Sequence, residues 1–317
     1  MGVECEILLQ KSKEGVFRPG EAVTGTANYF IDKPTKIASI FIDFVGKGVC
    51  QWSETDSDDE TTTYSNEEEY VNIHKNLFTP GDEEVLVSGT FEHPFEFLLP
   101  DDLPTSIENP ICTIDYKVIV TFIKDNYFGK KKRFEAEVPV YGYVNPCSQE
   151  PLEFGFKKDL FSLTNTYRFT VKAELDRTFL TPGENFILTL TVDNNTDTPI
   201  TIKAELIKHF TYRAATSLKQ SIQKETVDTT KTYSEPLEAN CVTNLTLSIP
   251  TLPSLYSIQH AKILIGEYKV RVTAKVPLAL PGNRAIVEVP VVIGERKDHH
   301  GAAAFGIEDE DPPEYAP

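Results

Sequence analysis

Apolar and polar residues alternate along several stretches of the chain, which is the pattern of β-strands with one buried face. In residues 167–175 every second residue is apolar, and residues 133–140 and 268–276 repeat this alternation. No sequence stretch of comparable length places apolar residues at helical spacing with capping residues at its ends. The sequence therefore predicts an all-β protein with very little helix, in which antiparallel sheets pack face to face as sandwiches.

Two landmarks occur twice in the same order. A Pro-Gly-Glu turn begins an alternating run at residues 19–21 and again at residues 182–184. Downstream, a segment with a Leu-Pro pair leads into a Tyr-Lys-Val strand at residues 99–118 and again at residues 249–270. This duplication predicts two domains of roughly 150 residues, a usual size for one hydrophobic core.

The duplicated landmarks and the composition between them define the expected domain boundaries. We place the first domain at residues 1–147 and the second at residues 161–294. An interdomain linker is expected over residues 148–160, because the segment 145–159 contains two prolines and shows little alternation. Residues 295–317 have too few apolar side chains to fold and are predicted to form a disordered acidic tail.

Composition narrows the class of protein. At 317 residues and 40% hydrophobic content, the chain can bury two cores. It has neither an apolar run of membrane-spanning length nor a signal-peptide pattern at its start, so a cytoplasmic location is expected. The five cysteines are odd in number and scattered, which favours buried, reduced thiols over a disulfide framework.

The net charge of −17 is concentrated in two segments. Residues 51–69 contain eight acidic residues and no lysine or arginine, and residues 295–317 carry a charge of −5. The rest of the chain is nearly neutral, which argues against nucleic-acid binding. We expect residues 51–69 to be a mobile acidic loop. Ser57, which precedes three acidic residues in this segment, is a candidate kinase target.

The sequence contains no recognisable catalytic or metal-binding motif. There is no nucleophile elbow, no phosphate-binding loop and no zinc-protease histidine pair. Asp56, Asp58 and Glu60 are spaced like calcium ligands, but no glycine follows at the required turn position. We therefore expect no enzyme activity, no cofactor and no metal ion.

A family resemblance rests on the paired Pro-Gly-Glu turns, the Tyr-Lys-Val strands and the string GTFEHPFEFLLP at residues 89–100. Together they resemble an arrestin-domain-containing protein of the α-arrestin family over about residues 1–294. The resemblance implies two tandem arrestin-like antiparallel β-sandwich domains and an adaptor function. One difference is that residues 159–163 lack the cysteines often found early in the second domain of relatives.

A short motif near the end of the chain suggests a partner. Pro312, Pro313 and Tyr315 form a Pro-Pro-x-Tyr motif. Two prolines favour the extended polyproline conformation, and their rings with the tyrosine fit the aromatic groove of a WW domain. The resemblance implies that such a tail motif recruits a HECT-type ubiquitin ligase.

A basic run, Lys130, Lys131, Lys132 and Arg133, lies where a hairpin turn is expected in the first domain. Two interpretations are open. The run is either a solvated turn or a contact for phosphate groups on a receptor tail or on lipid headgroups.

We interpret the sequence as that of a non-enzymatic adaptor. Its body would bind cytosolic segments of transmembrane proteins, and its tail would recruit the ligase, promoting ubiquitination and endocytic sorting at the plasma membrane or endosomes. One alternative is a retromer-like arrestin-fold subunit of a sorting complex, which does not need the tail motif. Another is a thiol-regulated binder resembling the thioredoxin-interacting relative, for which Cys241 is the candidate cysteine.

Overall fold

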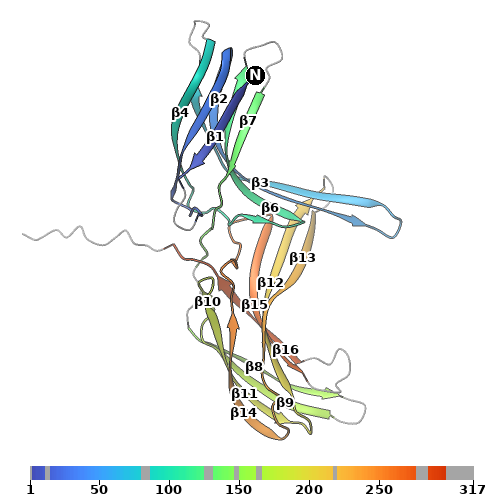
Figure 1. The fold of residues 1–317 in the computed structure, drawn as a ribbon. Helices are drawn as coiled ribbons and strands as arrows, with labels where there is room; N and C mark the ends of the chain where they lie inside the picture. The colour runs from blue at the N-terminus through green and yellow to red at the C-terminus, as the bar shows by residue number, and fades with distance from the viewer. Residues whose placement is uncertain are drawn as a thin grey trace, which may run out of the picture.

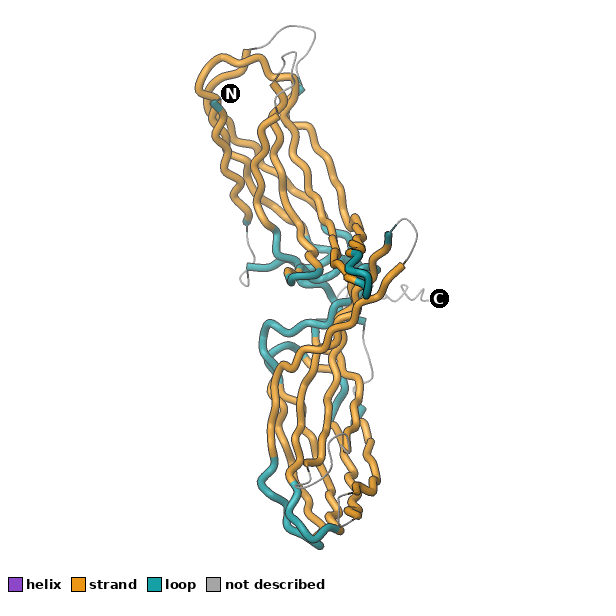
Figure 2. The backbone as a smooth tube through the Cα atoms, turned by 90° about the vertical axis from the view of Figure 1, so that its right-hand side faces the viewer, coloured by secondary structure: helices purple, strands orange, loops and turns teal. Residues whose placement is uncertain are grey.

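The structure, a computed structural model, describes residues 2–10, 15–79, 86–124, 131–145, 150–161, 166–216, 220–275 and 285–297 (Figure 1). These residues form sixteen strands and no helix, which confirms the predicted all-β class (Figure 2). No helix long and apolar enough to cross a membrane occurs in this described part of the chain.

The strands fall into two consecutive sets, one in each half of the chain. The first set is β1 (Val3–Leu9), β2 (Ala22–Thr55), β3 (Thr61–Phe78), β4 (Leu86–Leu98), β5 (Ile107–Glu108), β6 (Cys112–Lys124) and β7 (Lys131–Glu137). The second set is β8 (Leu152–Phe161), β9 (Thr166–Leu175), β10 (Phe179–Leu180), β11 (Asn185–Asn195), β12 (Thr201–Ala215), β13 (Gln220–Tyr233), β14 (Cys241–Pro250), β15 (Leu264–Lys275) and β16 (Ala285–Ile293).

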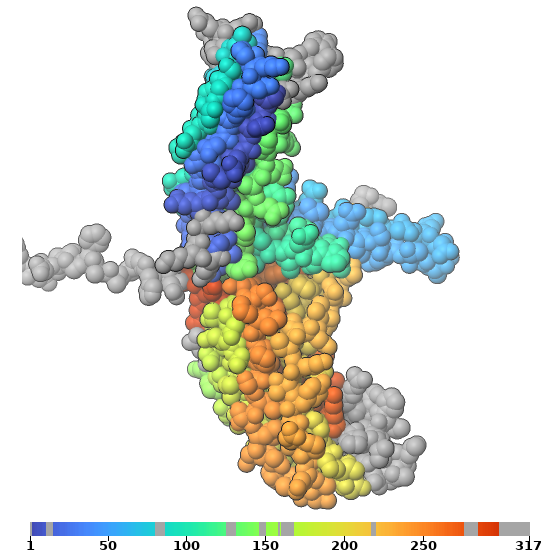
Figure 3. Space-filling model, viewed as in Figure 1, coloured from blue at the N-terminus to red at the C-terminus, as the bar shows by residue number. Residues whose placement is uncertain are grey.

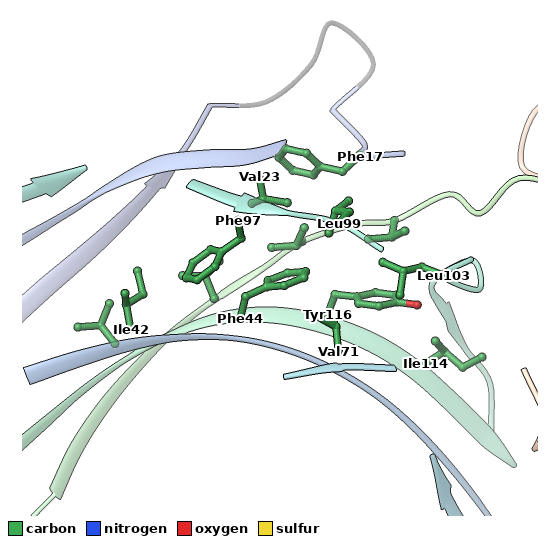
Figure 4. Packing of buried hydrophobic residues seen from close by; sticks show 14 of the residues in the cluster. Phe17, Val23, Ile42, Phe44, Val71, Phe97, Leu99, Leu103, Ile114 and Tyr116 are labelled. Carbon is green, nitrogen blue, oxygen red and sulfur yellow. The ribbon is translucent and has the colours of Figure 1, made fainter. Parts of the chain in front are cut away.

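The first domain is organised by β2, which is 34 residues long and takes part in two sheets. Its N-terminal part pairs with β1 and β4, and its C-terminal part pairs with β3 and β6. The register shifts between Ile31 and Thr35, where the strand passes from one sheet to the other. Between the sheets, the ring centroid of Phe44 lies 5.7 Å from that of Phe97 and 6.4 Å from that of Tyr116 (Figure 4).

The second domain is a sandwich of two sheets. One has the strand order β14-β11-β9-β8, and in the other β12 pairs with β13 and β15, and β15 pairs with β16. β10 pairs in parallel with the last two residues of β16, Val292 and Ile293. Phe169, Val171 and Leu175, which belong to the alternating run of β9, are buried in the core between the sheets. The period-two pattern therefore identified the buried face of this strand correctly.

The two domains are joined end to end, giving an elongated molecule (Figures 2 and 3). Phe210, Tyr212 and Ala214, near the end of β12, pack with the core of the first domain, while the start of β12 contributes to the second core. Ala215 of β12 also pairs with Ser65 of β3. The junction is thus an apolar contact that continues the first core, and such contacts favour a fixed domain arrangement.

The segment expected to be a linker, residues 148–160, differs from that expectation. It contains most of β8, which pairs with β9 along its whole length. Leu152, Phe154 and Phe156 pack against the second core and alternate with exposed residues. Pro146 and Pro151 both precede β8 in the chain, so they do not interrupt the ladder.

The acidic segment 51–69 is not an irregular loop. Its residues lie in β2 and β3, which pair up to Thr55 and Thr61, and a short turn connects them. Trp52 and Tyr64 stack across the hairpin at 5.8 Å and are nearly buried. We call this hairpin of residues 51–69 the arm; it projects sideways from the domain junction (Figure 3). Aromatic stacking and strand pairing offset the charge repulsion that suggested a loop.

The expectation that all the cysteines are reduced is also wrong. Cys50 of β2 and Cys112 of β6 are joined by a disulfide, and both residues are buried. They are directly opposite each other in the antiparallel ladder, although 62 residues separate them in sequence. Spacing along the chain carries no information about such a pairing, since the register of the sheet creates it.

Candidate functional surfaces

The Pro-Pro-x-Tyr motif lies outside the described residues, as does the whole of 298–317. The structure therefore does not test the disorder predicted there or the roles of Pro312, Pro313 and Tyr315. It does describe the three residues at the root of this segment, at positions 295–297.

A cluster of partly buried polar groups forms at this root, between the two domains. The guanidinium of Arg18 donates to the Glu295 carboxylate at 2.7 Å, and the Tyr256 hydroxyl donates to the same carboxylate at 3.3 Å. The Arg18 guanidinium also lies 5.6 Å from the ring centroid of Tyr141, which packs on Tyr256. Burial, with the Glu295 charge nearby, raises the pKa of Tyr256 to about 12. The cluster couples the first Pro-Gly-Glu turn to the end of the second domain.

The next two residues also contact the body. The Arg296 guanidinium lies 4.2 Å from the ring centroid of Phe179, and Lys297 forms a 2.7 Å ion pair with Asp101 of the first domain. The first residues of the predicted tail, 295–317, therefore belong to the folded body. Sequence reasoning missed this because their partners lie far away in the chain.

The side chains of the basic run, residues 130–133, do not all lie on one face of the sheet. Lys130 lies outside the described residues, and the other three residues are in β7. Lys131 and Arg133 are exposed, whereas Lys132 points to the opposite face, where its ammonium lies 5.0 Å from the ring centroid of Phe134. Alternation along the strand thus separates these cations onto two faces.

Acidic residues follow on the outer face of β7. Glu135 and Glu137 are exposed beyond Arg133, and on the neighbouring strand β6 Lys117 forms a 2.6 Å ion pair with Asp115. The outer face is therefore mixed in charge, and two outward cations, Lys131 and Arg133, remain from the run as phosphate-contact candidates.

The base of the arm is fastened to the second domain by the Glu68 carboxylate. Glu68 accepts hydrogen bonds from the backbone N–H groups of Lys262 at 2.7 Å and Ile263 at 3.3 Å. It also accepts from the Tyr70 hydroxyl at 3.1 Å, and burial together with the Glu68 charge raises the pKa of Tyr70. Charge-assisted bonds of this kind are among the stronger hydrogen bonds in proteins.

Two further hydrogen bonds join the arm to the second domain. The side-chain amide of Asn66 donates to the Arg213 carbonyl at 3.3 Å, and the Ser221 hydroxyl donates to Glu54 at 3.0 Å. The arm is thus anchored to the second domain from its base as far as Glu54, and its tip, residues 56–60, extends beyond these contacts.

Of the three cysteines outside the disulfide, Cys5 and Cys241 lie in the described part of the chain, and their surroundings differ. Cys241 is exposed at the start of β14. Cys5 is partly buried, and burial raises the pKa of its thiol to about 11, which disfavours the reactive thiolate. Within the residues that the structure describes, no group of three or more potential metal ligands comes together.

The tandem double sandwich defines the class of fold, and sequence comparison agrees with it. The family model described as Arrestin (or S-antigen), N-terminal domain, matches residues 5–144, and the corresponding C-terminal domain model matches residues 166–297. The chain therefore belongs to the arrestin family and is an arrestin-domain-containing protein. Members of this family are generally non-enzymatic adaptors.

Among the relatives is Arrestin domain-containing protein 5 of Homo sapiens, with 24% identity over 92% of this chain and 88% of the relative. The Bos taurus protein of the same name is 23% identical over 92% of both chains. Arrestin domain-containing protein 1 of Homo sapiens is 24% identical over 90% of this chain and 63% of the relative.

Proposed function

We propose that this protein is an adaptor that connects membrane-protein cargo to a WW-domain ubiquitin ligase of the HECT type. The observation that supports the proposal is the Pro-Pro-x-Tyr motif, which follows a body of the arrestin fold. Pro312 and Pro313 supply preordered apolar rings, and Tyr315 supplies an aromatic group with a polar tip.

The Pro-Pro-x-Tyr motif lies at a distance from the body that suits recruitment of a ligase. Pro312 is fifteen residues beyond Lys297, which is paired with the body at the domain junction. An extended chain of that length spans up to about 50 Å, so a ligase bound to the motif is held close to the body. Holding ligase and cargo on one scaffold raises their effective concentration, and ubiquitin transfer then requires no chemistry by the adaptor itself.

The arrestin-like body is the proposed cargo-binding part. Its ligands would be cytosolic segments of transmembrane proteins, which places the protein in the cytoplasm with recruitment to the plasma membrane or endosomes. Lys131 and Arg133, both exposed on β7, are the proposed contacts for phosphate groups or lipid headgroups.

The test measures the affinity of the full chain for an isolated WW domain of a HECT-type ligase by calorimetry. Tyr315→Ala should remove a hot-spot anchor worth about 2 kcal/mol or more, which corresponds to roughly a thirtyfold loss of affinity. Glu314→Ala is the matched control and should change the affinity much less, because in an extended repeat of three residues per turn Glu314 does not share the face of Pro312 and Tyr315.

Phosphorylation of Tyr315 should also abolish binding, since it brings a doubly charged group to an aromatic pocket. Equal affinity of the native and Tyr315→Ala chains would refute ligase recruitment through this motif. The retromer-like subunit of a sorting complex would then be the better interpretation.

A further inference from the structure

The arm carries a hydroxyl-rich acidic segment that the proposed adaptor function does not use. Ser53, Thr55 and Ser57 are each followed by acidic residues at the next position and at the third position. Kinases with a basic substrate groove recognise such carboxylates through charge complementarity and charge-assisted hydrogen bonds. The sequence favours Ser57 only by the three consecutive acidic residues that follow it.

The structure separates two of them from the third. Ser53 and Thr55 lie in the strand ladder of the arm, paired with Thr63 and Thr61. Their hydroxyl groups also form cross-strand hydrogen bonds, Ser53 with Thr63 at 3.0 Å and Thr55 with Thr61 at 3.2 Å. Phosphorylation at either position would require strand pairing to open first.

Ser57 lies instead in the exposed turn at the tip of the arm. The turn is held by Asp56, whose Oδ1 accepts from the backbone N–H groups of Asp58 at 2.9 Å and Glu60 at 3.0 Å. The Ser57 side chain takes no part in these hydrogen bonds. It is therefore accessible without loss of the contacts that hold the turn.

The tip extends beyond the contacts that fasten the arm. Of these, Glu54 lies two residues before the turn and Asn66 and Glu68 lie nearer the base, while residues 56–60 are all exposed. A two-stranded ribbon without a covered face is only marginally stable by itself, so the tip can adapt to the active-site groove of an enzyme.

We propose that Ser57 is a phosphorylation site for an acid-directed serine/threonine kinase. The Ser57 Oγ attacks the γ-phosphorus of Mg-ATP, and a bond forms between Oγ and this phosphorus. The bond from the γ-phosphorus to the oxygen bridging it to the β-phosphorus breaks, and ADP leaves. The hydroxyl proton passes to the catalytic base of the kinase. Asp58, Asp59 and Glu60 provide the negative charges that the substrate groove recognises.

Phosphorylation would change the tip and leave the base of the arm intact. The phosphate adds a charge of about −1.5 to −2 at pH 7 beside the carboxylates of Asp56, Asp58, Asp59 and Glu60. Repulsion among like charges should loosen the turn, so amide exchange should accelerate over residues 55–61 and stay unchanged over residues 64–70.

The experiment incubates the folded full chain with Mg-ATP and casein kinase 2, a reagent with acid-directed specificity, and locates phosphate by tandem mass spectrometry. One phosphate on Ser57 is expected. Ser57→Ala should lower incorporation at least tenfold, whereas Ser53→Ala and Thr55→Val should leave it within about twofold. Glu60→Gln should slow incorporation, because it removes the charge at the third position.

The kinase is first shown to be active on a standard acidic substrate, and a synthetic peptide of residues 50–66 shows whether the unfolded segment is accepted. With that active kinase, a folded chain that stays unmodified would overturn the proposal, whether or not the peptide accepts phosphate. Phosphate on Ser53 or Thr55 of the folded chain at a rate equal to that on Ser57 would overturn it as well. These outcomes do not depend on ligase recruitment, because the tail motif is present in every variant.

Discussion

The Arg18–Glu295 ion pair should stabilise the junction between the two domains by a measurable coupling. The side chains are 11% and 30% exposed, and the nitrogen–oxygen distance is 2.7 Å. A hydrogen bond to a charged group contributes about 1.5–3 kcal/mol, and breaking a fully buried ion pair costs about 3–5 kcal/mol. Since this pair is partly exposed, we expect Arg18→Met to lower the free energy of unfolding by about 2 kcal/mol.

A double-mutant cycle with Glu295→Gln isolates the pair from the other contacts of Arg18, such as the Tyr141 ring. The expected coupling free energy is about 1–2 kcal/mol, within the range for residues in direct contact. The assay is urea unfolding followed by fluorescence of Trp52, the single tryptophan of the chain, which is nearly buried at the base of the arm. Strictly additive effects of the two substitutions would show that the pair does not hold the domains together.

Three further predictions concern a buried lysine, the disulfide and a buried side-chain amide. Burial lowers the pKa of Lys208 to about 8 from 10.5, so the folded protein bears the cost of a buried charge below pH 8 and regains stability as the pH rises from 8 to 10.5. In thermal denaturation at pH 7, the Lys208→Met variant should therefore be more stable than the native protein by up to about 3 kcal/mol. This difference in stability should shrink as the pH approaches 10.5. Equal stability of the variant and the native protein at pH 7 would contradict the prediction. Replacing Cys50 and Cys112 by alanine should lower the free energy of unfolding in urea by about 2–4 kcal/mol, and dithiothreitol should bring the native protein close to the variant. Asn194 is fully buried and donates to backbone carbonyl oxygens, so Asn194→Ala should cost about 2–4 kcal/mol in thermal denaturation, whereas exposed Asn195→Ala should change stability by less than about 0.5 kcal/mol.

The sequence by itself determined the class of fold and the duplication. Alternation with a period of two is a local property, because successive side chains of a strand point to opposite faces wherever the strand lies. Phe169 and Val171 could therefore be assigned to a core before their partner sheet was known. The Pro-Pro-x-Tyr motif is equally local, since four consecutive residues carry its chemistry. The predictions from sequence were wrong for β8, which was expected to be a linker, and for the arm, which was expected to be a loop. In both segments, alternation of apolar and polar residues occurs together with features that are typical of loops.

Only the tertiary structure decided which distant residues meet. Arg18 and Glu295 are 277 positions apart, and Cys50 and Cys112 are separated by 62. Neither pair has a signal in its own neighbourhood, because the register of the sheets and the packing of the two domains create the contact. The structure also adds that Ser57 lies in a turn, whereas Ser53 and Thr55 lie in paired strands. Local periodicity specifies which face of a strand is buried, whereas long-range register specifies what that face contacts.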